Sequence, residues 1–277
     1  MKNPIDLAAE AAAFADQYQM LPQGSTVLCA VSGGKDSMAL LSVLQTLAPE
    51  RNLMIHAAHF NHQLRGEESQ RDEDFVSKWC ADHNIPLTIG SGDVAQAAQA
   101  QGKGIEETAR AMRYGFLTET AQEVGAEKIA TAHNADDNAE TVIMRMIRGT
   151  GLKGLGAITP VSGNIIRPML LINRQEVEEF LLAWGLPHRE DSSNASDAFL
   201  RNRIRHTVMP LLKSENPRLA ENLSLMALRL REDEDFLAAQ SDSPTLPGVQ
   251  TLRAMPKAQR SRCIERFLKD RGVREPE

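Results

Sequence analysis

An apolar segment, a glycine-rich turn and a helix-like segment follow one another near the N-terminus, and this succession constrains the fold more than any other feature. Residues 26–31 read TVLCAV, a short apolar run rich in β-branched residues, and SGGKDS follows at 32–37. The next residues, MALLSVLQTL, favour a helix. A buried strand that leads through a turn into a helix begins a βαβ unit, so the sequence predicts an α/β protein.

Strand-like and helix-like segments continue to alternate as far as residue 148. The further predicted strands are 52–60, 86–89 and 128–132, and two of the helices are 69–83 and 136–148. In the first of these helices, Phe75, Val76 and Trp79 are expected to face inward. Another helix is marked on one face by Ile105, Ala109, Met112 and Phe116. Strands separated by helices pair in parallel, so we predict a Rossmann-like parallel sheet with helices on both faces.

The pattern changes after Gly149. A glycine-rich loop and a brief strand near Ile165 are predicted first, followed by helices at 174–184 and 202–212, with Pro210 near the end of the second. A longer helix is marked by Leu219, Leu223, Met226 and Leu230. SDSPTLPG at 241–248 is typical of a linker and precedes a small helical unit. We predict a catalytic domain at 1–214 and a helical domain at 215–277, to which the resemblance described below gives tRNA binding. Since Pro276 and Glu277 would open another helix, truncation of the second domain is one expectation.

Charge and cysteine usage exclude several classes of protein. The chain has 31 Lys and Arg against 37 Asp and Glu, a formal charge of −6, so any contact with nucleic acid must be a local basic patch. No segment reaches the roughly 18 apolar residues of a spanning helix. Cys29, Cys80 and Cys263 form no C-x-x-C pair, which argues against a disulfide framework, a zinc ribbon and a local redox motif. We predict a soluble, cytoplasmic protein with no membrane partner.

The turn SGGKDS is suited to binding an anion. Gly33 and Gly34 let backbone N–H groups approach a ligand, and the start of the following helix adds its partial positive charge. The spacing is neither that of a Walker A loop nor that of a Rossmann fingerprint. A phosphate site is therefore predicted. The alternative is an ordinary strand-to-helix turn in which Ser32 or Asp36 caps the helix.

A second polar segment, TAHNADDNAET at 131–141, follows a predicted strand. Asp137, Glu140 and Thr141 share one face of the predicted helix, and the residues expected on its buried face are Val142, Ile143, Met146 and Ile147. Open parallel sheets bind ligands at the carboxyl ends of their strands, so two carboxylates and His133 are expected beside the loop. The alternative, which stays open for Asp136 alone, is an acidic first turn capped by Asn134.

Basic side chains form local groups despite the negative total charge. The arginines in question are Arg110, Arg113, Arg145, Arg148, Arg189, Arg201, Arg203 and Arg205, with His206 beside the last. Arginine suits phosphate and base edges, so these groups predict contact with RNA. For Arg110 the alternative is an ion pair with Glu106. The spacing of His56, His59 and His62 suggests a metal, but the three alternate in direction along a strand and no acid or thiol completes a ligand set.

Taken together, these motifs resemble a known family. SGGKDS is similar to the PP-loop of the N-type ATP pyrophosphatases. With AHFNHQLRGEES from Ala58, IEETARAMRYGFL from Ile105, TAHNADDNAETVIMRMIRGTGLKGLGAI from Thr131 and EDSSNASDAFLRNRIRH from Glu190, the chain resembles the bacterial tRNA(Ile)-lysidine synthetases. That family usually has a second histidine where this chain has Asn134, and often glutamine at Asn138. A catalytic role for position 134 is therefore in doubt.

The resemblance implies a fold, a reaction and its partners. The fold is that of the PP-loop ATP pyrophosphatases with a small C-terminal helical domain. The reaction joins free L-lysine to carbon 2 of the wobble cytidine in tRNA(Ile) with a CAU anticodon, through an adenylated cytidine, and releases AMP and pyrophosphate. ATP and Mg²⁺ are the implied cofactors. The sequence leaves the oligomeric state open, and a homodimer is one expectation.

The resemblance also implies roles for individual residues. The catalytic assignments are Asp36, Arg113, His133, Asp137 and Glu140, with Asp36 also on Mg²⁺. The residues assigned to ATP are Ala30, Ser32, Gly33, Gly34, Lys35, Asp36, Ser37 and His59. Those assigned to tRNA or substrate are Arg110, Arg113, Thr141, Arg201 and Arg205, with Arg203 a weaker candidate.

Three other functions are weighed against this one. A PP-loop tRNA thiolase would need cysteines as sulfur carriers or cluster ligands, and no C-x-x-C is present. A nucleotide-binding module without catalysis would leave the paired carboxylates without a purpose. A small-molecule amidotransferase or synthetase would be expected to bring a glutaminase nucleophile turn, and the sequence has none.

Overall fold

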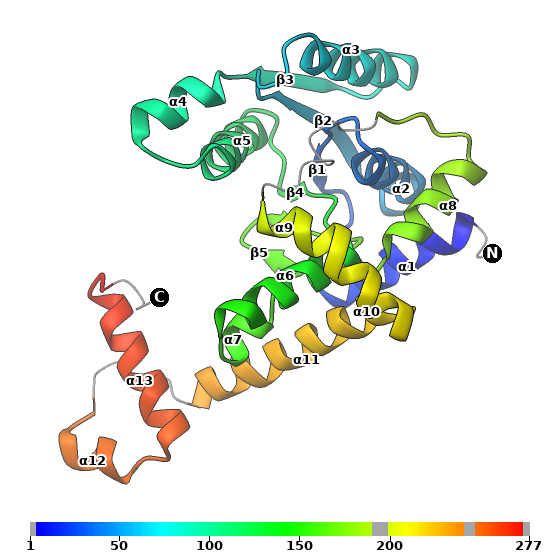
Figure 1. Ribbon diagram of the computed structural model, residues 1–277. Helices are drawn as coiled ribbons and strands as arrows, with labels where there is room; N and C mark the ends of the chain where they lie inside the picture. The colour runs from blue at the N-terminus through cyan, green and yellow to red at the C-terminus, as the bar shows by residue number, and fades with distance from the viewer. Residues whose placement is uncertain (1–3, 190–198, 241–246, 274–277) are drawn as a thin grey trace.

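The computed structural model describes residues 4–189, 199–240 and 247–273, and its centre is a six-stranded sheet (Figure 1). The strands are β1 (Thr26–Ala30), β2 (Met54–Asn61), β3 (Leu87–Ser91), β4 (Lys128–Ala130), β5 (Val161–Ser162) and β6 (Ile165–Ile166). Their order is β3-β2-β1-β4-β6-β5, and all neighbours are parallel except β5, which pairs antiparallel with β6. The predicted α/β class with a parallel sheet is confirmed. The antiparallel strand at the edge was not predicted.

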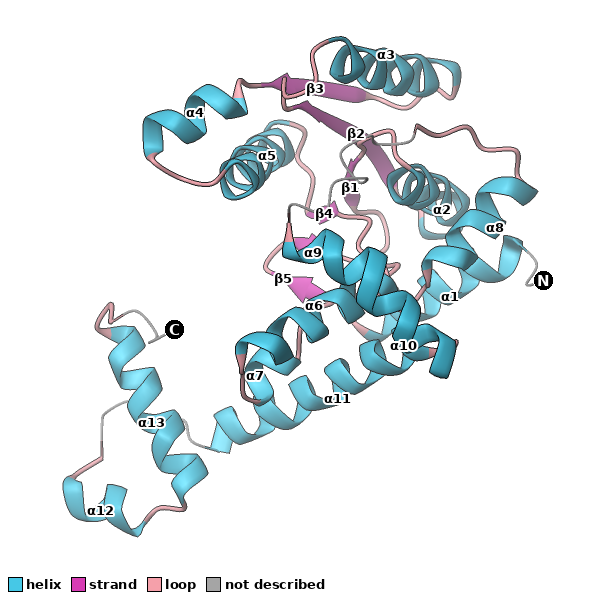
Figure 2. Ribbon diagram, in the orientation of Figure 1, coloured by secondary structure: helices cyan, strands magenta, loops and turns pink. Residues whose placement is uncertain are grey.

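Helices surround this sheet (Figure 2). Those of the first half are α1 (Pro4–Gln17), α2 (Lys35–Arg51), α3 (Glu67–Asp82), α4 (Val94–Gln101) and α5 (Ile105–Glu123). Those that follow β4 are α6 (Ala135–Arg148), α7 (Leu152–Leu155), α8 (Arg174–Ala183), α9 (Leu200–Arg203), the π-helix η2 (Ile204–Val208), α10 (Met209–Glu215), α11 (Leu219–Gln240), α12 (Val249–Ala254) and α13 (Lys257–Asp270). Within these ranges, no helix is both long and apolar enough to span a membrane.

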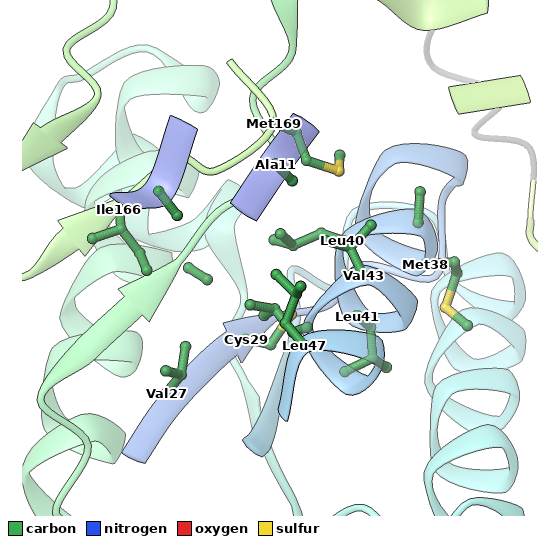
Figure 3. Close-up of a cluster of buried hydrophobic side chains, with 14 of the residues drawn as sticks. Ala11, Val27, Cys29, Met38, Leu40, Leu41, Val43, Leu47, Ile166 and Met169 are labelled. Atoms are coloured by element: carbon green, nitrogen blue, oxygen red, sulfur yellow. The ribbon is translucent and has the colours of Figure 1, made fainter. Parts of the chain in front are cut away.

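Side chains of β1 alternate between two apolar layers, as a central strand requires. Val27 and Cys29 belong to the larger core, shown in Figure 3, together with residues of α1, α2, α3 and α8. Leu28 faces the other way and packs with Leu117 and Ala121 of α5. Each fully buried aliphatic side chain contributes about 1.5–3 kcal/mol, so the two layers fix β1 firmly between them. The expectation that Cys29 is a core residue is confirmed.

The direction of chain progression reverses beside β1. Strands β2 and β3 follow on one side of β1, and α2 and α3 lie on one face of the sheet. The chain then returns through α5 on the opposite face to place β4 on the other side of β1. At such a reversal, the loops that leave the two central strands diverge to opposite faces and leave room for a ligand between them. The segments after β1 and β4 are the two that the sequence singles out.

Two predicted buried faces are wrong in part. Ile105 is 50% exposed, because the first turn of α5 extends beyond the sheet and the buried stripe of the helix starts at Thr108. In α6, Met146 and Ile147 are 55% and 61% exposed. Only the N-terminal part of α6 lies in the core, so the predicted apolar face reaches solvent in its last turn.

Pro210 does not lie near the end of one helix. The predicted helix at 202–212 is divided into α9, η2 and α10, and Pro210 lies in the first turn of α10. Proline has no N–H and clashes with the carbonyl four residues before it. The wider π-helical turn just before it accommodates both effects and keeps the chain helical. Helix α4, capped by Asp93, was not predicted at all.

The C-terminal helices extend from the rest of the molecule (Figure 1). Ala220 and Ala227 of α11 pack in the same apolar clusters as α6. Helix α13 contacts α11 through an ion pair between Arg262 and Glu234. Residues 241–246 of the predicted linker lie outside the described residues, and the division at 214/215 stays a prediction.

Candidate functional site

The turn after β1 is held open for a ligand by its own hydrogen bonds. Ser37 Oγ accepts the Ser32 N–H at 3.1 Å and donates to Gly34 O at 2.9 Å. Gly33 has φ +89°, which favours glycine, and a Cβ there would lie 3.4 Å from Phe75 and Val76. Among the described residues no side chain caps α2, so the alternative in which Ser32 or Asp36 caps the helix is wrong, and the first N–H groups of α2 suit an anion.

Two further segments border this turn. The Arg189 N–H donates to Gly33 O at 2.9 Å, and the Arg189 guanidinium lies 5.3 Å from the centre of the Phe75 ring. Lys35, expected at the phosphates, forms an ion pair with Glu178 of α8 at 3.1 Å. Residues 190–198, which include the DSSN of the resemblance, lie outside the described residues.

His59 lies beneath the end of β1 rather than at an open surface. It is 4% exposed, and Nδ1–H donates to Val31 O at 2.8 Å. Burial lowers the pKa of the imidazole, so it is neutral at physiological pH. His59 thus supports the strand that carries Ala30 into the turn. Its assignment to ATP stays a prediction.

Asn134 connects the two predicted motifs. Its Nδ2 donates to Asp36 Oδ1 at 2.9 Å, which joins the start of α2 to the start of α6. Its Oδ1 also accepts the Asp137 N–H at 2.9 Å, and Asp137 Oδ2 accepts the Asn134 N–H at 3.2 Å, a complete capping box. Asn134 therefore caps α6, as the structural alternative held, and in addition orients a carboxylate of the neighbouring motif.

Asp36 is a partly buried carboxylate, and the charged groups around it include Arg174 and Arg205 as well as Asp137. Burial raises the pKa of its carboxyl to about 6, and the charge of Asp137 acts in the same direction. Among the described residues Asp36 takes a hydrogen bond from Asn134 but forms no ion pair. A desolvated carboxylate without a cation of its own fits a divalent ion that is completed by phosphate oxygens.

Asp136 has a structural role. It is 2% exposed, accepts the backbone N–H of Arg174 at 2.7 Å and pairs with Lys213. These contacts tie α6 to the start of α8 and to α10. Of the acidic residues in this turn, Asp136 alone therefore faces the scaffold.

Asp137 and Glu140 form what we call the carboxylate cluster, together with Arg174, Arg201 and Arg205. Glu140 is 1% exposed and lies 2.7 Å from Arg205 Nε and 3.0 Å from Arg201 Nε. Arg201 and Arg205 reach Asp137 at 3.0 and 3.1 Å, and Arg174 lies 3.3 Å from Glu140. Three cations thus surround two anions.

This arrangement changes the expected environment of two tRNA candidates. Arg201 and Arg205 were expected to face phosphate or tRNA, and in the structure both hold carboxylates. Thr141 donates to Asp137 O at 2.8 Å within α6. A ligand ammonium that binds these two carboxylates would compete with the guanidinium groups that now contact them.

A second group, the arginine cluster, consists of Arg110, Arg113 and Arg167 near His133. Arg110 and Arg113 lie 4.7 and 5.4 Å from the centre of the Tyr114 ring. Arg110 stacks there rather than pairing with Glu106, so that alternative is wrong. Burial, and next the charge of Arg167, lower the pKa of His133 to about 3, which keeps the imidazole neutral.

Besides Arg174 of the carboxylate cluster, the sequence analysis missed Arg167. It directly follows β6, next to β4, and Thr131 N–H donates to Ile166 O at 3.0 Å. The available signal was a charged residue at the end of the apolar pair Ile165–Ile166, at the same edge of the sheet as the other motifs.

The histidine and cysteine residues add no further site among the described residues. No group of three or more His, Cys, Asp or Glu there could hold a metal ion, and His56 Nε2 lies 2.8 Å from Thr88 Oγ1. The three cysteines are buried, and burial raises the pKa of Cys80 to about 11. Burial raises the pKa of the Cys29 thiol as well, so Cys29 and Cys80 are protonated core groups.

Comparison with known proteins places this site in a family context. The model of the PP-loop domain family matches residues 7–212. The tRNA(Ile)-lysidine synthase of Caldanaerobacter subterraneus subsp. tengcongensis is 40% identical over 228 residues, which are 82% of this chain and 49% of that protein. The tRNA(Ile)-lysidine synthase of Geobacter sulfurreducens is 38% identical over 281 residues, 96% and 59% of the two chains. The chain thus spans about half the length of the curated relatives it matches.

A solved structure shows the same fold at low identity. The U34-tRNA thiolase NcsA from Methanococcus maripaludis superimposes with a TM-score of 0.68 at 20% identity, covering 82% of this chain and 79% of that chain. At this identity the likeness concerns the arrangement of the sheet and its helices.

Proposed function

The chain belongs to the PP-loop domain family, and from this premise we propose that it carries the ATP- and lysine-using site of a tRNA(Ile)-lysidine synthase. The reaction is the conversion of the wobble cytidine of CAU-anticodon tRNA(Ile) to lysidine, through an adenylated cytidine. The observation that carries the proposal is the bond between Asp36 and Asn134. It joins an anion-binding turn directly to the helix that bears Asp137 and Glu140.

In the first step the turn at 32–37 and the start of α2 bind the pyrophosphate part of ATP through backbone N–H groups. Asp36, with phosphate oxygens, would hold Mg²⁺, and the ion supplies charge neutralisation as pyrophosphate departs. The 2-oxygen of cytosine attacks the α-phosphorus, the bond between the α- and β-phosphates breaks, and adenylation turns a poor leaving group into a good one. The role of this chain is to align the two reactants.

In the second step the ε-amine of lysine attacks carbon 2 and AMP leaves with the former 2-oxygen. The amine must be neutral when it attacks, so a base takes its proton. Asp137 and Glu140 would bind the lysine ammonium groups in place of the arginines. A displaced guanidinium is then available for the lysine carboxylate. His133, which is neutral, would donate a hydrogen bond rather than carry a proton.

The test is pyrophosphate release from ATP by this chain with Mg²⁺. We compare tRNA(Ile) with a CAU anticodon against its UAU variant, each with and without lysine. Release is expected only with the wobble cytidine. Lysine should then give AMP and a mass gain on the tRNA equal to lysine minus water. Release that is indifferent to the tRNA would overturn the proposal in favour of a small-molecule PP-loop synthetase.

A further inference from the structure

The chain turns back towards the sheet at the end of α7, and two arginines from different helices hold this turn. Arg145 of α6 donates through Nη1 to Gly154 O at 2.6 Å and to Ala157 O at 3.3 Å. Arg231 of α11 donates through Nη2 to Gly156 O at 2.8 Å and to Ala157 O at 3.1 Å. Ala157 O therefore accepts hydrogen bonds from both guanidinium groups.

These two guanidinium groups are desolvated without an acid partner. Among the described residues neither Arg145 nor Arg231 forms an ion pair, and the Arg231 Nε is buried without a hydrogen-bond partner. Burial lowers the pKa of both side chains, and for Arg231 the charge of Asp235 acts in the other direction. A charge that loses water without gaining an anion lowers stability. The fold thus gives up stability to hold this turn.

The turn contains a backbone conformation that alanine rarely adopts. Ala157 has φ +40°, a region that the Cβ of an L-residue disfavours. Its side chain is buried and packs with Val142 of α6 and Ala227 of α11. A Cβ on Gly156 would lie 3.3 Å from both Cβ and Nη2 of Arg231, so the glycine permits a close approach. The bonds from Arg231 therefore help to keep Ala157 in a strained conformation.

The residues that follow connect this turn to the candidate site, and we call 157–159 the return segment. The Ile158 N–H donates to Asn138 Oδ1 at 2.9 Å. Asn138 is fully buried and directly follows the first acid of the carboxylate cluster on α6. Thr159 O and Oγ1 accept hydrogen bonds from Arg167 Nη1 at 2.6 and 3.2 Å. One end of the return segment is thus held at the α7 turn, and the other contacts residues beside the site.

We propose that Arg231 is a positioning residue, which fixes the return segment and through it the side chains of Asn138 and Arg167. Arg145 holds the same turn from α6, whereas Arg231 holds it from α11, the helix that leads to α12 and α13. A shift of α11 would therefore move the return segment. The expected effect on turnover rests on the proposed function, but the coupling of Arg231 to the return segment does not.

The first test measures amide hydrogen exchange at Ile158 by NMR in the wild-type chain and in Arg231→Met. Methionine keeps much of the volume and removes the charge and its donors. Exchange at Ile158 should become about ten- to hundredfold faster, because the return segment opens more easily. Arg231→Lys should keep most of the protection, since one ammonium group can donate to both carbonyl oxygens. If Arg231→Met does not fold, Arg231→Gln replaces it.

Ala157→Gly tests the role of the strained backbone. Glycine adopts positive φ as readily as negative φ, so in this background the turn depends less on Arg231. We expect Arg231→Met to accelerate exchange at Ile158 less in Ala157→Gly than in the wild type, by a factor of about five or more. Equal acceleration in the two backgrounds overturns the proposal.

The second test measures kcat and KM for lysidine formation. Arg231→Met should lower kcat about tenfold, because small displacements of reacting groups slow the chemical step. The KM for ATP should stay the same, since the turn at 32–37 is not part of the return segment, and Arg231→Lys should restore most of kcat. Arg51→Met is the matched control. It removes a half-buried arginine that pairs with Asp16 between α2 and α1, and should lower stability without changing kcat.

The outcomes separate this proposal from the proposed function. Unchanged exchange at Ile158 in a folded Arg231→Met overturns the proposal, and so does faster exchange with an unchanged kcat. An equal fall of kcat in Arg51→Met also overturns it, because the effect would then reflect stability alone. If the wild-type chain forms no lysidine, the proposed function fails, and the exchange data still decide whether Arg231 fixes the return segment.

Discussion

The two clusters beside the start of α6 both contain three arginines, but they differ in whether acids pair with those arginines. In the carboxylate cluster, Arg174, Arg201 and Arg205 enclose Asp137 and Glu140, and each arginine holds at least one acid. In the part of the chain that the structure describes, no acid pairs with an arginine of the arginine cluster, and the Arg167 Nε has no hydrogen-bond partner. Glu140 in the first cluster and Arg167 in the second are both buried, so the difference between these two groups lies in charge balance rather than in burial.

The comparison separates stability from binding. A buried charge that is paired inside the protein is strongly destabilised when its partner is removed. A buried charge without a partner lowers the stability of the folded protein, and a bound ligand of opposite sign can offset this loss. Substitutions in the carboxylate cluster should therefore affect folding and lysine use, and substitutions in the arginine cluster should affect phosphate binding.

The largest effect is expected for Glu140→Gln. Glu140 is 1% exposed and contacts three guanidinium groups, so its loss leaves them to repel one another around Asp137 alone. We expect a loss of about 3–5 kcal/mol in the free energy of unfolding, measured with urea. Glu178→Gln, at the exposed ion pair with Lys35, is the control and should change stability by less than about 1 kcal/mol. Equal effects of the two substitutions would show that the buried cluster is not special.

Asp137→Asn should act next most strongly, on the use of lysine. The amide keeps the size of the side chain but loses the charge that would bind an ammonium group. We expect kcat/KM for lysine to fall about ten- to hundredfold while ATP affinity stays the same. Lysidine formation and ATP binding are measured separately. Full lysidine formation by the variant would remove Asp137 from the lysine site.

Asp36→Asn should stabilise the protein, by about 1–3 kcal/mol at pH 8 in metal-free buffer. The pKa of Asp36 in the folded state is about 6, above the ordinary 3.8, so the unfolded chain loses the proton first and stability falls as pH rises from about 4 to 6. The variant lacks this dependence and can still accept the bond from Asn134 Nδ2. Thermal unfolding of both proteins at pH 4 and pH 8 checks it. A difference that is the same at both pH values would contradict a raised pKa of Asp36 in the folded protein.

The smallest effect is expected for Arg110→Gln. Arg110 is exposed and stacks on Tyr114, so stability should change by less than about 1 kcal/mol. The pKa of His133 should rise, because one of the charges that lower it is removed, and it should rise less than in Arg167→Met. In the folded protein His133 stays neutral, whereas in the unfolded chain it binds a proton below about pH 6.5. The wild type therefore loses stability as pH falls below about 6.5, and a higher pKa of His133 in the folded protein makes this loss smaller. NMR titration of the imidazole measures both shifts, and equal shifts would contradict the order of influence.

The sequence predicted secondary structure and turns correctly where one segment determines its own conformation. The run TVLCAV became β1, and the turn that follows it has the positive φ at Gly33 that its glycines suggested. The acidic segment after β4 became the first turn of α6, capped by Asn134. The ends and divisions of strands and helices were predicted less accurately. The helix at 202–212, for instance, proved to contain a π-helical turn before Pro210.

Contacts between distant segments were harder to predict from the sequence. Met146 and Ile147 fit an apolar face by period alone, but none of the residues that the structure describes covers that turn. Arg201 and Arg205 were assigned to phosphate or tRNA because arginines suit both, whereas the carboxylates that hold them lie 61 to 68 residues earlier. Arg167 was not predicted because its signal, a charge at the end of a two-residue strand, has meaning only once that strand is known to pair with β4.

The sequence by itself determined the α/β class, the anion-binding turn and the acidic helix start, because hydrophobic period, glycine and capping residues act within a few residues of the chain. Only the tertiary structure decided which charges meet. The strand order places the ends of β1, β4 and β6 at one edge of the sheet, and α5, α8 and α9 deliver their arginines there from different directions. Electrostatic partners depend on distance in space, and a buried charge is balanced or left unbalanced only when the whole fold has closed around it.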